Sequence, residues 1–205
     1  MSQIALPLVL RGDGGARRIV AGSANATVID ALARPESWPF RTALLSGPPR
    51  SGKSLLALWF GESGRGEAID DADKVDETEL FHRWNYAQER GTALLLVSST
   101  APGDWHITLP DLASRVGAAL HLEIGEPDDA MLADLLALHA EMRGLVLDHS
   151  AAAYLVPRCI RSHLGVERLV AEIDRLSLER KAPATMAIWR DALEAIEGPE
   201  QPRLL

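Results

Sequence analysis

Cysteine is nearly absent from this chain of 205 residues, and its histidines are scattered. The single cysteine, Cys159, can form no internal disulfide, so the fold does not depend on a disulfide framework. The six histidines lie far apart and lack the spacing of metal ligands, which argues against a site built from His and Cys clusters. We therefore expect a cytoplasmic protein without a structural metal site.

The chain also lacks a long apolar run and an excess of positive charge. No segment approaches the roughly 20 apolar residues of a membrane span. The first residues are interrupted by Pro7 and do not resemble a signal peptide, so we expect no membrane association. The formal net charge is −8. Because such a field repels the phosphate backbone, direct sequence-specific DNA binding is disfavoured.

Short apolar segments alternate with helical patterns in the first half of the chain. This alternation is typical of a parallel β-sheet with helical crossovers, and it predicts an α/β fold. The predicted strands are Thr42–Ser46, Ala68–Asp70, Ala93–Ser98 and Ala119–Ile124.

The pattern changes after Pro127, where apolar residues recur at helical spacing. Asp128 is placed to cap the first of these helices, and Gly144 to end it. We expect a small helical lobe built from the segments Asp128–Arg143, Asp148–Arg158, Gly165–Arg180 and Thr185–Ile196.

One segment matches the phosphate-binding pattern G-x-x-x-x-G-K-[ST], and it lies between a predicted strand and a predicted helix. Backbone N–H groups of such a loop form a cradle for a phosphate. Lys53 would neutralise the phosphates and Ser54 would hold Mg²⁺. A glycine-rich turn with a surface lysine is the weaker alternative, because the motif and its context are both present. The predicted nucleotide contacts are Gly47, Pro48, Pro49, Arg50, Ser51, Gly52, Lys53, Ser54 and Leu55.

An acidic pair follows the next predicted strand. A P-loop ATPase needs acidic groups there to orient the metal's water shell and to position the attacking water. We assign the metal role to Asp70 and the water-positioning role to Asp71. Further carboxylates follow closely, so a plain solvated acidic loop is the alternative.

Several segments resemble the DnaA/Hda branch of the AAA+ proteins, and the resemblance covers nearly the whole chain. The most distinctive is Leu109–Arg115, which is close to the "LPDLxSR" signature of Hda-like proteins. The family uses the final arginine as an arginine finger on the nucleotide of an adjacent subunit, and this role falls on Arg115. The alternative for Arg115 is a surface arginine at a helix end.

Other segments extend the resemblance. Ile19–Asn25 corresponds to the family's segment before the phosphate loop, which places Val20 and Asn25 at the adenine. A generic loop entering a helix at Ala26–Ala33 is the alternative. Phe81–Ala87 resembles the family's helix after the acidic pair, where we interpret Trp84 as a packed core aromatic.

Two sensor positions depart from the family. Leu94–Thr100 resembles the sensor-1 strand, but Ser99 stands where the family has aspartate, so we expect weak intrinsic ATPase activity. The alternative for Ser99 is a simple cap at the end of the strand. The sensor-2 arginine expected near Leu164 is absent, and Arg161 or Arg168 is a candidate substitute. Either of these arginines is alternatively a solvated charge.

The spacing between Lys53 and Asp70 is short, at seventeen positions. It accommodates one helix, a loop and a strand, but no further strand–helix unit. If the sheet follows the AAA+ strand order, the strand–helix unit that does not fit here is the one that contributes the edge strand. We therefore predict a reduced sheet of four parallel strands, with the strand that ends at Asp70 at its edge.

The N-terminal hexapeptide resembles the sliding-clamp-binding motif Q-L-x-L-P-L of Hda proteins. Its glutamine amide and apolar anchors suit a hydrophobic pocket. A short edge strand or a frayed terminus is the alternative. The predicted clamp contacts are Gln3, Ile4, Leu6, Pro7 and Leu8.

The resemblance implies four parts: a clamp-binding segment at 1–10, a nucleotide-binding subdomain at 11–126, a helical lid at 127–197 and a tail at 198–205. It implies binding of ADP or ATP with Mg²⁺, and we expect no helix-turn-helix DNA-binding domain. The expected partners are the DNA polymerase III sliding clamp and the initiator DnaA, whose ATP hydrolysis Arg115 would stimulate. The resemblance is also compatible with a homodimer of this chain. The alternatives are an autonomous ATPase motor of the helicase-loader type and a nucleotide-locked adaptor that acts only by binding.

Overall fold

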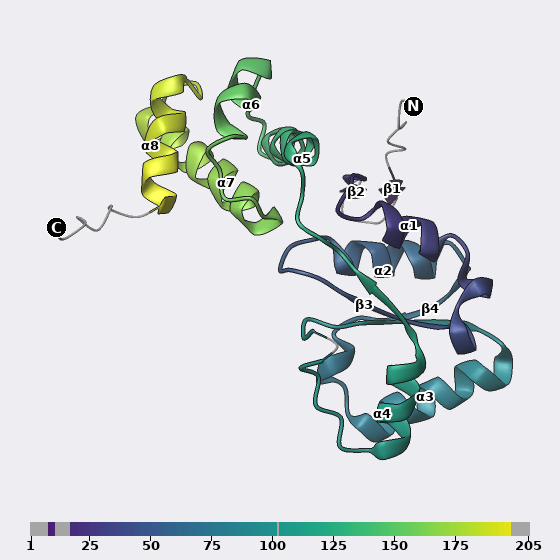
Figure 1. The fold of residues 1–205 in the computed structure, drawn as a ribbon. Coiled ribbons are helices and arrows are strands. Elements are labelled where there is room, and N and C mark those ends of the chain that lie inside the picture. Colours follow the sequence, from purple (N-terminus) through teal and green to yellow (C-terminus); the bar gives the residue numbers. More distant parts are fainter. Residues whose placement is uncertain (1–7, 11–16, 102, 198–205) are drawn as a thin grey trace. The chain divides into compact units, whose positions relative to one another are not determined.

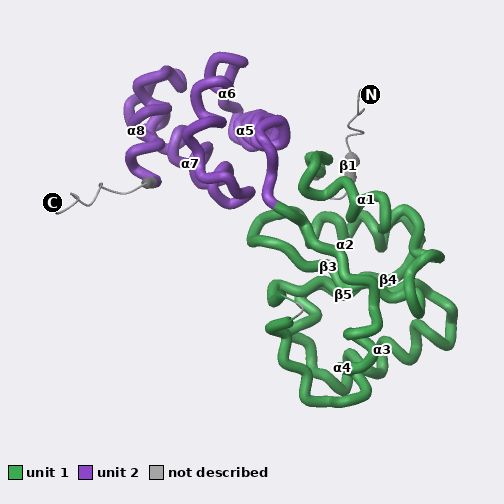
Figure 2. The backbone as a smooth tube through the Cα atoms, in the orientation of Figure 1, with its two compact units in different colours: residues 1–125 green, residues 126–205 purple. Residues whose placement is uncertain are grey.

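The computed structural model describes residues 8–10, 17–101 and 103–197 of the chain. The chain divides into two compact units, residues 1–125 and residues 126–205, drawn in green and purple in Figure 2. Among the described residues, no helix combines the length and the apolar character needed to cross a membrane.

The first unit is built on a parallel sheet. In the described part of the chain this sheet has four strands in the order β4-β5-β3-β6, and all neighbouring strands run parallel. The predicted α/β fold with four parallel strands is therefore confirmed. The strands are β3 (Thr42–Ser46), β4 (Gly66–Ile69), β5 (Ala93–Val97) and β6 (Leu120–Glu123).

Helices cover both faces of this sheet (Figure 1). One face packs against α1 (Ala26–Leu32) and α2 (Lys53–Glu62), and the other against α3 (Glu77–Arg90) and α4 (Pro110–Ala118). The alternation of side chains along β5 explains this arrangement: Leu95 enters the core of the first face, whereas Leu94 and Leu96 enter the core of the second. A strand buried on both sides must be apolar throughout.

The strand before the acidic pair lies at the edge of the sheet, as predicted. β4 pairs with β5 alone in the described sheet, and it begins at Gly66, two residues before the predicted start. The prediction missed this start because Gly66 and Glu67 carry no apolar signal, although their backbones pair with Ala93 and Leu94.

Smaller elements complete the first unit. β1 (Leu8–Leu10) and β2 (Arg17–Ile19) form a separate antiparallel pair, in which Leu8 is opposite Ile19. In its described residues, three short 3-10 helices cover Pro35–Ser37, Pro39–Arg41 and Ala72–Lys74.

The second unit contains the helices α5 (Asp129–Met142), α6 (His149–Leu155), α7 (His163–Arg180) and α8 (Met186–Glu197). Asp128 caps α5 by accepting a hydrogen bond from the backbone of Met131 at 2.9 Å, and Gly144 follows the helix with φ of 69°, both as predicted.

Two helices in this unit differ from the prediction by more than one residue at an end, and the other two by one residue at each end. The helix predicted to reach Arg158 ends at Leu155. The next helix begins earlier than Gly165, because the hydroxyl of Ser162 accepts a hydrogen bond from the backbone N–H of Gly165 and so caps α7 from His163 onward. A polar cap carries no apolar periodicity, so the pattern could not locate this start.

Candidate functional site

The carboxyl ends of the four parallel strands meet at one edge of the sheet. This edge carries the loop after Ser46, the acidic loop after Ile69 and the polar residues after Val97. In open α/β sheets, ligands bind at this edge. The topology thus brings together the phosphate-binding pattern, the acidic pair and Ser99, which are separate in the sequence.

The loop between β3 and α2 has a backbone that requires glycine at two positions. Gly47 has φ of 152°, and a Cβ there would lie 2.9 Å from Cβ of Ile124, which directly follows β6. Gly52 has φ of 90° at the N-cap of α2, where L-residues are strained. The two glycines therefore permit the tight backbone path between β3 and α2.

Lys53, the first residue of α2, folds back over this loop. Its Nζ atom lies 2.7 Å from the carbonyl oxygen of Gly47 and 3.1 Å from that of Pro48. Burial lowers the pKa of Lys53, and the nearby carboxylates of Asp70 and Asp71 partly oppose that shift. The ammonium group is therefore positioned inside the loop and not in bulk solvent.

The residues present fit a nucleotide phosphate. The loop ends at the N-terminus of α2, where backbone N–H groups and the helix dipole favour an anion. Ser51 is buried, and its hydroxyl has no hydrogen-bond partner among the described residues. A buried hydroxyl without a partner is costly, so a ligand that accepts from it would be favoured.

A metal ion at this edge would need ligands beyond the protein. In the part of the chain that the structure describes, no group of three or more His, Cys, Asp or Glu side chains could hold a metal ion. Ser54 and Asp70 are both exposed. Mg²⁺ commonly takes most of its ligands from water and substrate phosphates, so one hydroxyl and one carboxylate are sufficient protein ligands.

The acidic loop is joined to the end of β5 by side-chain contacts. Asp71 has φ of 49°, and its Oδ1 lies 2.9 Å from Nζ of Lys74 and 3.2 Å from the hydroxyl of Ser99. The hydrogen bond from Lys74 holds the pKa of Asp71 below its ordinary value. Asp73 accepts from the hydroxyl of Thr100 at 2.7 Å.

Sequence reasoning assigned no role to Asp73 or Lys74. Asp73 also accepts from the backbone N–H groups of Ser99 and Thr100, at 3.4 and 3.1 Å, and therefore ties the acidic loop to the end of β5. The carboxylate cluster after Ile69 was the available signal, but a contact across 27 positions cannot be inferred from it.

The segment assigned to adenine is held by Asn25. This residue is buried; its Oδ1 accepts from the backbone of Gly22 at 2.9 Å, and its Nδ2 donates to the carbonyl of Val20 at 2.8 Å. Both ends of the amide thus bind the chain's own backbone. Asn25 shapes the loop that carries Val20 and does not point freely toward a ligand.

Arg115 lies in α4 and contacts α3. Its Nη1 donates to Oδ1 of Asn85 at 2.5 Å, and its guanidinium carbon lies 4.1 Å from the ring centroid of Phe81 and 4.2 Å from that of Trp84. Trp84 also packs against the core, as predicted.

The start of α4 is held by α3 as well. The carboxylate of Glu77 accepts hydrogen bonds from the backbone N–H groups of Thr108 and Leu109, at 2.9 and 2.7 Å, and from the Thr108 hydroxyl at 2.8 Å. The backbone hydrogen bond from Thr108 contributes most to lowering the pKa of Glu77. Glu77 therefore anchors the segment that carries Arg115.

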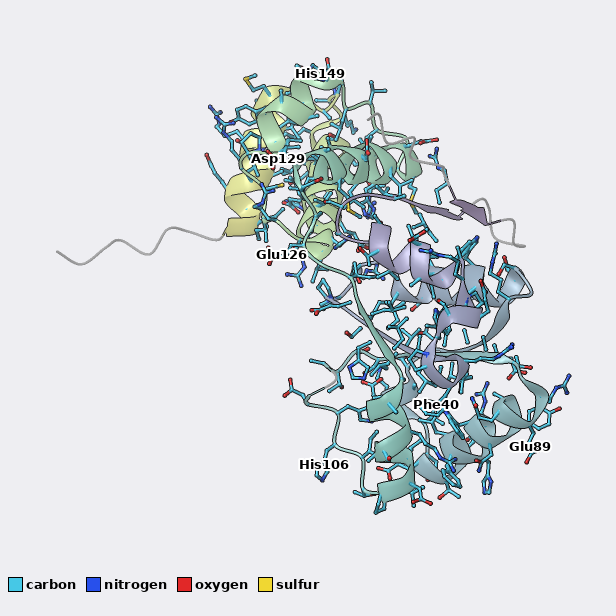
Figure 3. The ribbon with its side chains drawn as sticks, turned by 45° about the vertical axis from the view of Figure 1, so that its right-hand side comes forward. Phe40, Glu89, His106, Glu126, Asp129 and His149 are labelled. Atoms are coloured by element: carbon cyan, nitrogen blue, oxygen red, sulfur yellow. The ribbon has the colours of Figure 1, made fainter. Side chains whose placement is uncertain are left out.

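The remaining predicted contacts lie away from the sheet edge or outside the described residues. Arg161 belongs to the second unit, where Nη1 lies 2.6 Å from Oδ1 of Asp129, a residue labelled in Figure 3. Leu8 lies in β1, paired with β2. The other predicted clamp contacts, Gln3, Ile4, Leu6 and Pro7, lie outside the described residues.

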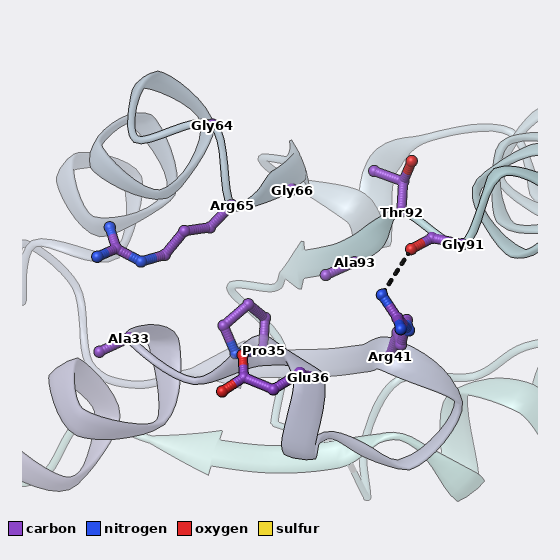
Figure 4. Close-up of a pocket in the computed structure, with 10 residues that line it drawn as sticks. All are labelled: Ala33, Pro35, Glu36, Arg41, Gly64, Arg65, Gly66, Gly91, Thr92 and Ala93. Carbon is purple, nitrogen blue, oxygen red and sulfur yellow. Dashed lines mark hydrogen bonds between the residues drawn. The ribbon is translucent and has the colours of Figure 1, made fainter.

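A groove of about 470 Å³ lies at the opposite, amino-terminal ends of β4 and β5 (Figure 4). It is lined by residues that include Arg41, Arg65, Gly66 and Ala93, and Arg41 donates to the carbonyl of Gly91 at 2.9 Å. The phosphate loop, in contrast, follows the carboxyl end of β3. The groove therefore does not coincide with the candidate site.

Comparison with known proteins identifies the fold. No family model matches the chain. Domain III of the Thermotoga maritima replication initiation protein DnaA superposes with a TM-score of 0.71 at 14% sequence identity, over 87% of this chain and 95% of that one. The Thermotoga maritima RuvB Holliday junction branch migration motor matches with a TM-score of 0.59 at 18% identity, over 85% of this chain and 69% of that one.

A replication initiator DnaA bound to AMPPCP and single-stranded DNA matches with a TM-score of 0.58 at 18% identity. That match covers 78% of this chain and 65% of the initiator, so the chain spans slightly less than two thirds of its length. At these low identities the likeness concerns the fold alone, which resembles that of DnaA domain III.

Proposed function

We propose that this chain is a nucleotide-binding regulator of replication initiation, which binds the DNA sliding clamp and stimulates ATP hydrolysis by DnaA through Arg115. The observation that carries the nucleotide part is the loop Gly47–Ser54, with Lys53 folded into it at the carboxyl edge of the sheet. A DnaA of the same fold is described as bound to AMPPCP.

At this site each residue would have a defined task. Backbone N–H groups of the loop and Lys53 would bind the phosphates, Ser54 and Asp70 would hold Mg²⁺, and Asp71 would orient water. Mg²⁺, when bound there, would neutralise charge on the phosphates. Arg161 would have to leave its ion pair with Asp129 before it could serve a nucleotide.

The regulatory part depends on Arg115. A planar guanidinium can donate two parallel hydrogen bonds to phosphoryl oxygens, which stabilises the charge that develops during transfer. Arg115 lies on α4, on the α3 side of the sheet, whereas the phosphate loop leads into α2, on the other side. An arginine outside the chain's own phosphate loop suits action on the nucleotide of another subunit.

One observation favours the adaptor alternative for the chain's own site. The carboxylate of Asp71 is already engaged by Lys74 and Ser99. A general base with these partners accepts a proton less readily, which is consistent with binding without rapid hydrolysis. Under this alternative the chain would act by binding only.

The deciding experiment measures ATP hydrolysis by DnaA, with and without this chain, in the presence of clamp loaded on DNA. Arg115→Ala should abolish the stimulation while the chain keeps its own nucleotide affinity, because the finger serves another subunit's nucleotide. Fingers supplied in trans contribute on the order of 10³ to 10⁵ in rate. Arg115→Lys should restore little, because a point charge does not reproduce the planar fork.

Arg90→Ala is the matched control, since Arg90 also contacts an aromatic ring of α3, that of Tyr86. It should leave the stimulation unchanged. Full stimulation by Arg115→Ala would refute the role of Arg115 as an arginine finger and favour the adaptor alternative. Rapid ATP hydrolysis by this chain alone, no faster when DnaA is present, would favour the alternative of an autonomous ATPase motor.

A further inference from the structure

Three side chains of α3 surround the guanidinium of Arg115, and we call Phe81, Trp84 and Asn85 the Arg115 cradle. Phe81 and Trp84 place their rings at 4.1 and 4.2 Å from the guanidinium carbon, well inside the range of a cation–π contact. Asn85 accepts from Nη1 at 2.5 Å. Positions 81, 84 and 85 share one face of a helix, so one rigid element supplies all three contacts.

The same face of α3 also holds the start of α4. Glu77 is one helical turn before Phe81, and its carboxylate binds the backbone of Thr108 and Leu109. The helix that carries Arg115 is thus held by Glu77 at the two residues before its start and by the cradle at its arginine. Two fixed points define both the position of α4 and the direction of its arginine.

The residue type at position 84 indicates more than core packing. The indole Nε1 of Trp84 is buried and has no hydrogen-bond partner among the described residues. A buried donor without a partner is costly, and a phenyl ring would fill apolar space without that cost. The indole, however, gives the strongest cation–π face of the three aromatic side chains. Contact with Arg115 therefore explains a tryptophan here better than packing does.

We propose that the cradle positions Arg115 before it meets a phosphoryl group, so that Phe81, Trp84 and Asn85 are positioning residues of the finger. Asn85 occupies one of the five N–H donors of a guanidinium. A group held in place in advance loses little freedom on contact, and it stabilises developing charge without reorganisation. This inference rests on the proposed function of Arg115.

The first measurement concerns the cradle alone. Side-chain NMR of the full chain should show the Arg115 Nε–H proton displaced by aromatic ring currents, with the signal assigned by its loss in Arg115→Lys. Trp84→Leu should return this proton toward the position of an exposed arginine. Tyr86→Leu is the control: Tyr86 lies on the same helix but contacts Arg90 instead. It should leave the Arg115 signal unchanged.

The second measurement is the stimulation of DnaA hydrolysis as a function of the concentration of each variant. Misplacing a catalytic group by about 1 Å costs up to 10²-fold in rate, so Trp84→Leu and Asn85→Ala should lower the maximal stimulated rate by about tenfold or more. The half-saturating concentration should stay near that of the wild type. If Trp84→Leu does not fold, Trp84→Phe and Asn85→Ala provide the same test with smaller changes.

The outcomes are distinct. An unchanged maximal rate in folded Trp84 and Asn85 variants would overturn the positioning role. A change confined to the half-saturating concentration would also overturn it, because the cradle would then be a docking surface for the partner. If the wild-type chain does not stimulate DnaA, the proposed function and this inference both fail. A displaced Arg115 signal with no stimulation would show that the contacts exist and that the function was wrong.

Discussion

The hydroxyl of Ser99 donates a hydrogen bond to the carboxylate of Asp71, with the oxygen atoms 3.2 Å apart. This contact joins the end of β5 to the loop after β4, and Lys74 engages the same carboxylate oxygen. The residue expected to sense the nucleotide is therefore bound to the residue expected to position water. Any effect of one on hydrolysis should depend on the other.

We expect Asp71→Asn to lower the chain's own ATP hydrolysis, whatever its basal level, by about 10²- to 10⁴-fold, because a positioned base contributes that range. ATP affinity should stay near wild type. Lys74→Met, which leaves Ser99 as the remaining partner of the carboxylate, should raise the rate. Steady-state hydrolysis and equilibrium binding measure both effects. Glu89→Gln, an exposed carboxylate at the far end of α3, should change nothing, and an equal loss there would contradict the assignment.

Lys53→Ala should abolish measurable binding of ADP and ATP, a loss of more than about a hundredfold, because it removes a charged donor from the phosphate loop. Isothermal calorimetry gives the affinity directly. Lys74→Ala is the control, since Lys74 binds Asp71 and lies outside the phosphate loop. Unchanged affinity in Lys53→Ala would refute the nucleotide site.

The combined variant Gln3→Ala, Leu6→Ala, Leu8→Ala should lose clamp binding by at least about thirtyfold, the effect expected when anchor residues are truncated. Nucleotide affinity should remain near wild type, because the segment lies outside the phosphate loop. Surface plasmon resonance with immobilised clamp measures the first property and calorimetry the second. Retained clamp binding would leave Leu8 as part of a simple strand pair.

Gly66→Ala should destabilise the protein by about 1 to 3 kcal/mol, the usual effect of overpacking. A Cβ at Gly66 would lie 2.4 Å from the carbonyl oxygen of Ala93 and 2.7 Å from the ring of Phe60. Gly61→Ala is the matched control within α2, where a Cβ meets nothing within 4 Å and should stabilise the helix by about 0.5 to 1 kcal/mol. Denaturant unfolding compares the two, and equal effects would contradict the close packing at β4.

Asp73→Asn should lower the free energy of unfolding by about 1 kcal/mol at neutral pH, a value reduced for the solvent exposure of this loop. Burial tends to raise the pKa of Asp73, but hydrogen bonds from Thr100 and Ser99 outweigh it and lower the pKa overall. The stabilisation is therefore present above the unfolded pKa, about 3.9, and is lost as the pH falls through the lower folded value.

Denaturant unfolding of wild type and Asp73→Asn from pH 7 to pH 2 tests this dependence. The difference between them should be constant above about pH 5 and should shrink below pH 4. A difference that grows toward low pH would have the wrong sign for a carboxylate with a lowered pKa.

Local patterns in the sequence were sufficient for much of the fold. The strand Thr42–Ser46 was predicted with its observed bounds, since a short apolar run before a glycine-rich loop is a strong local signal. The edge position of β4 followed from the spacing of seventeen positions from Lys53 to Asp70, because chain length limits how many elements fit. Two boundaries were missed because apolar residues do not mark them. Strand pairing sets the start of β4 at Gly66, and a polar cap sets the start of α7 at His163.

The phosphate loop was determined by the sequence itself, because its eight residues are contiguous and their glycines set the backbone. The surroundings of Arg115 were decided only by the tertiary structure. Asn85 precedes Arg115 by 30 positions, and the two meet because α3 and α4 pack on the same face of the sheet. Asp71 and Ser99, 28 positions apart, meet because adjacent parallel strands end together. A sequence pattern records spacing along one element, whereas these contacts depend on how separate elements pack.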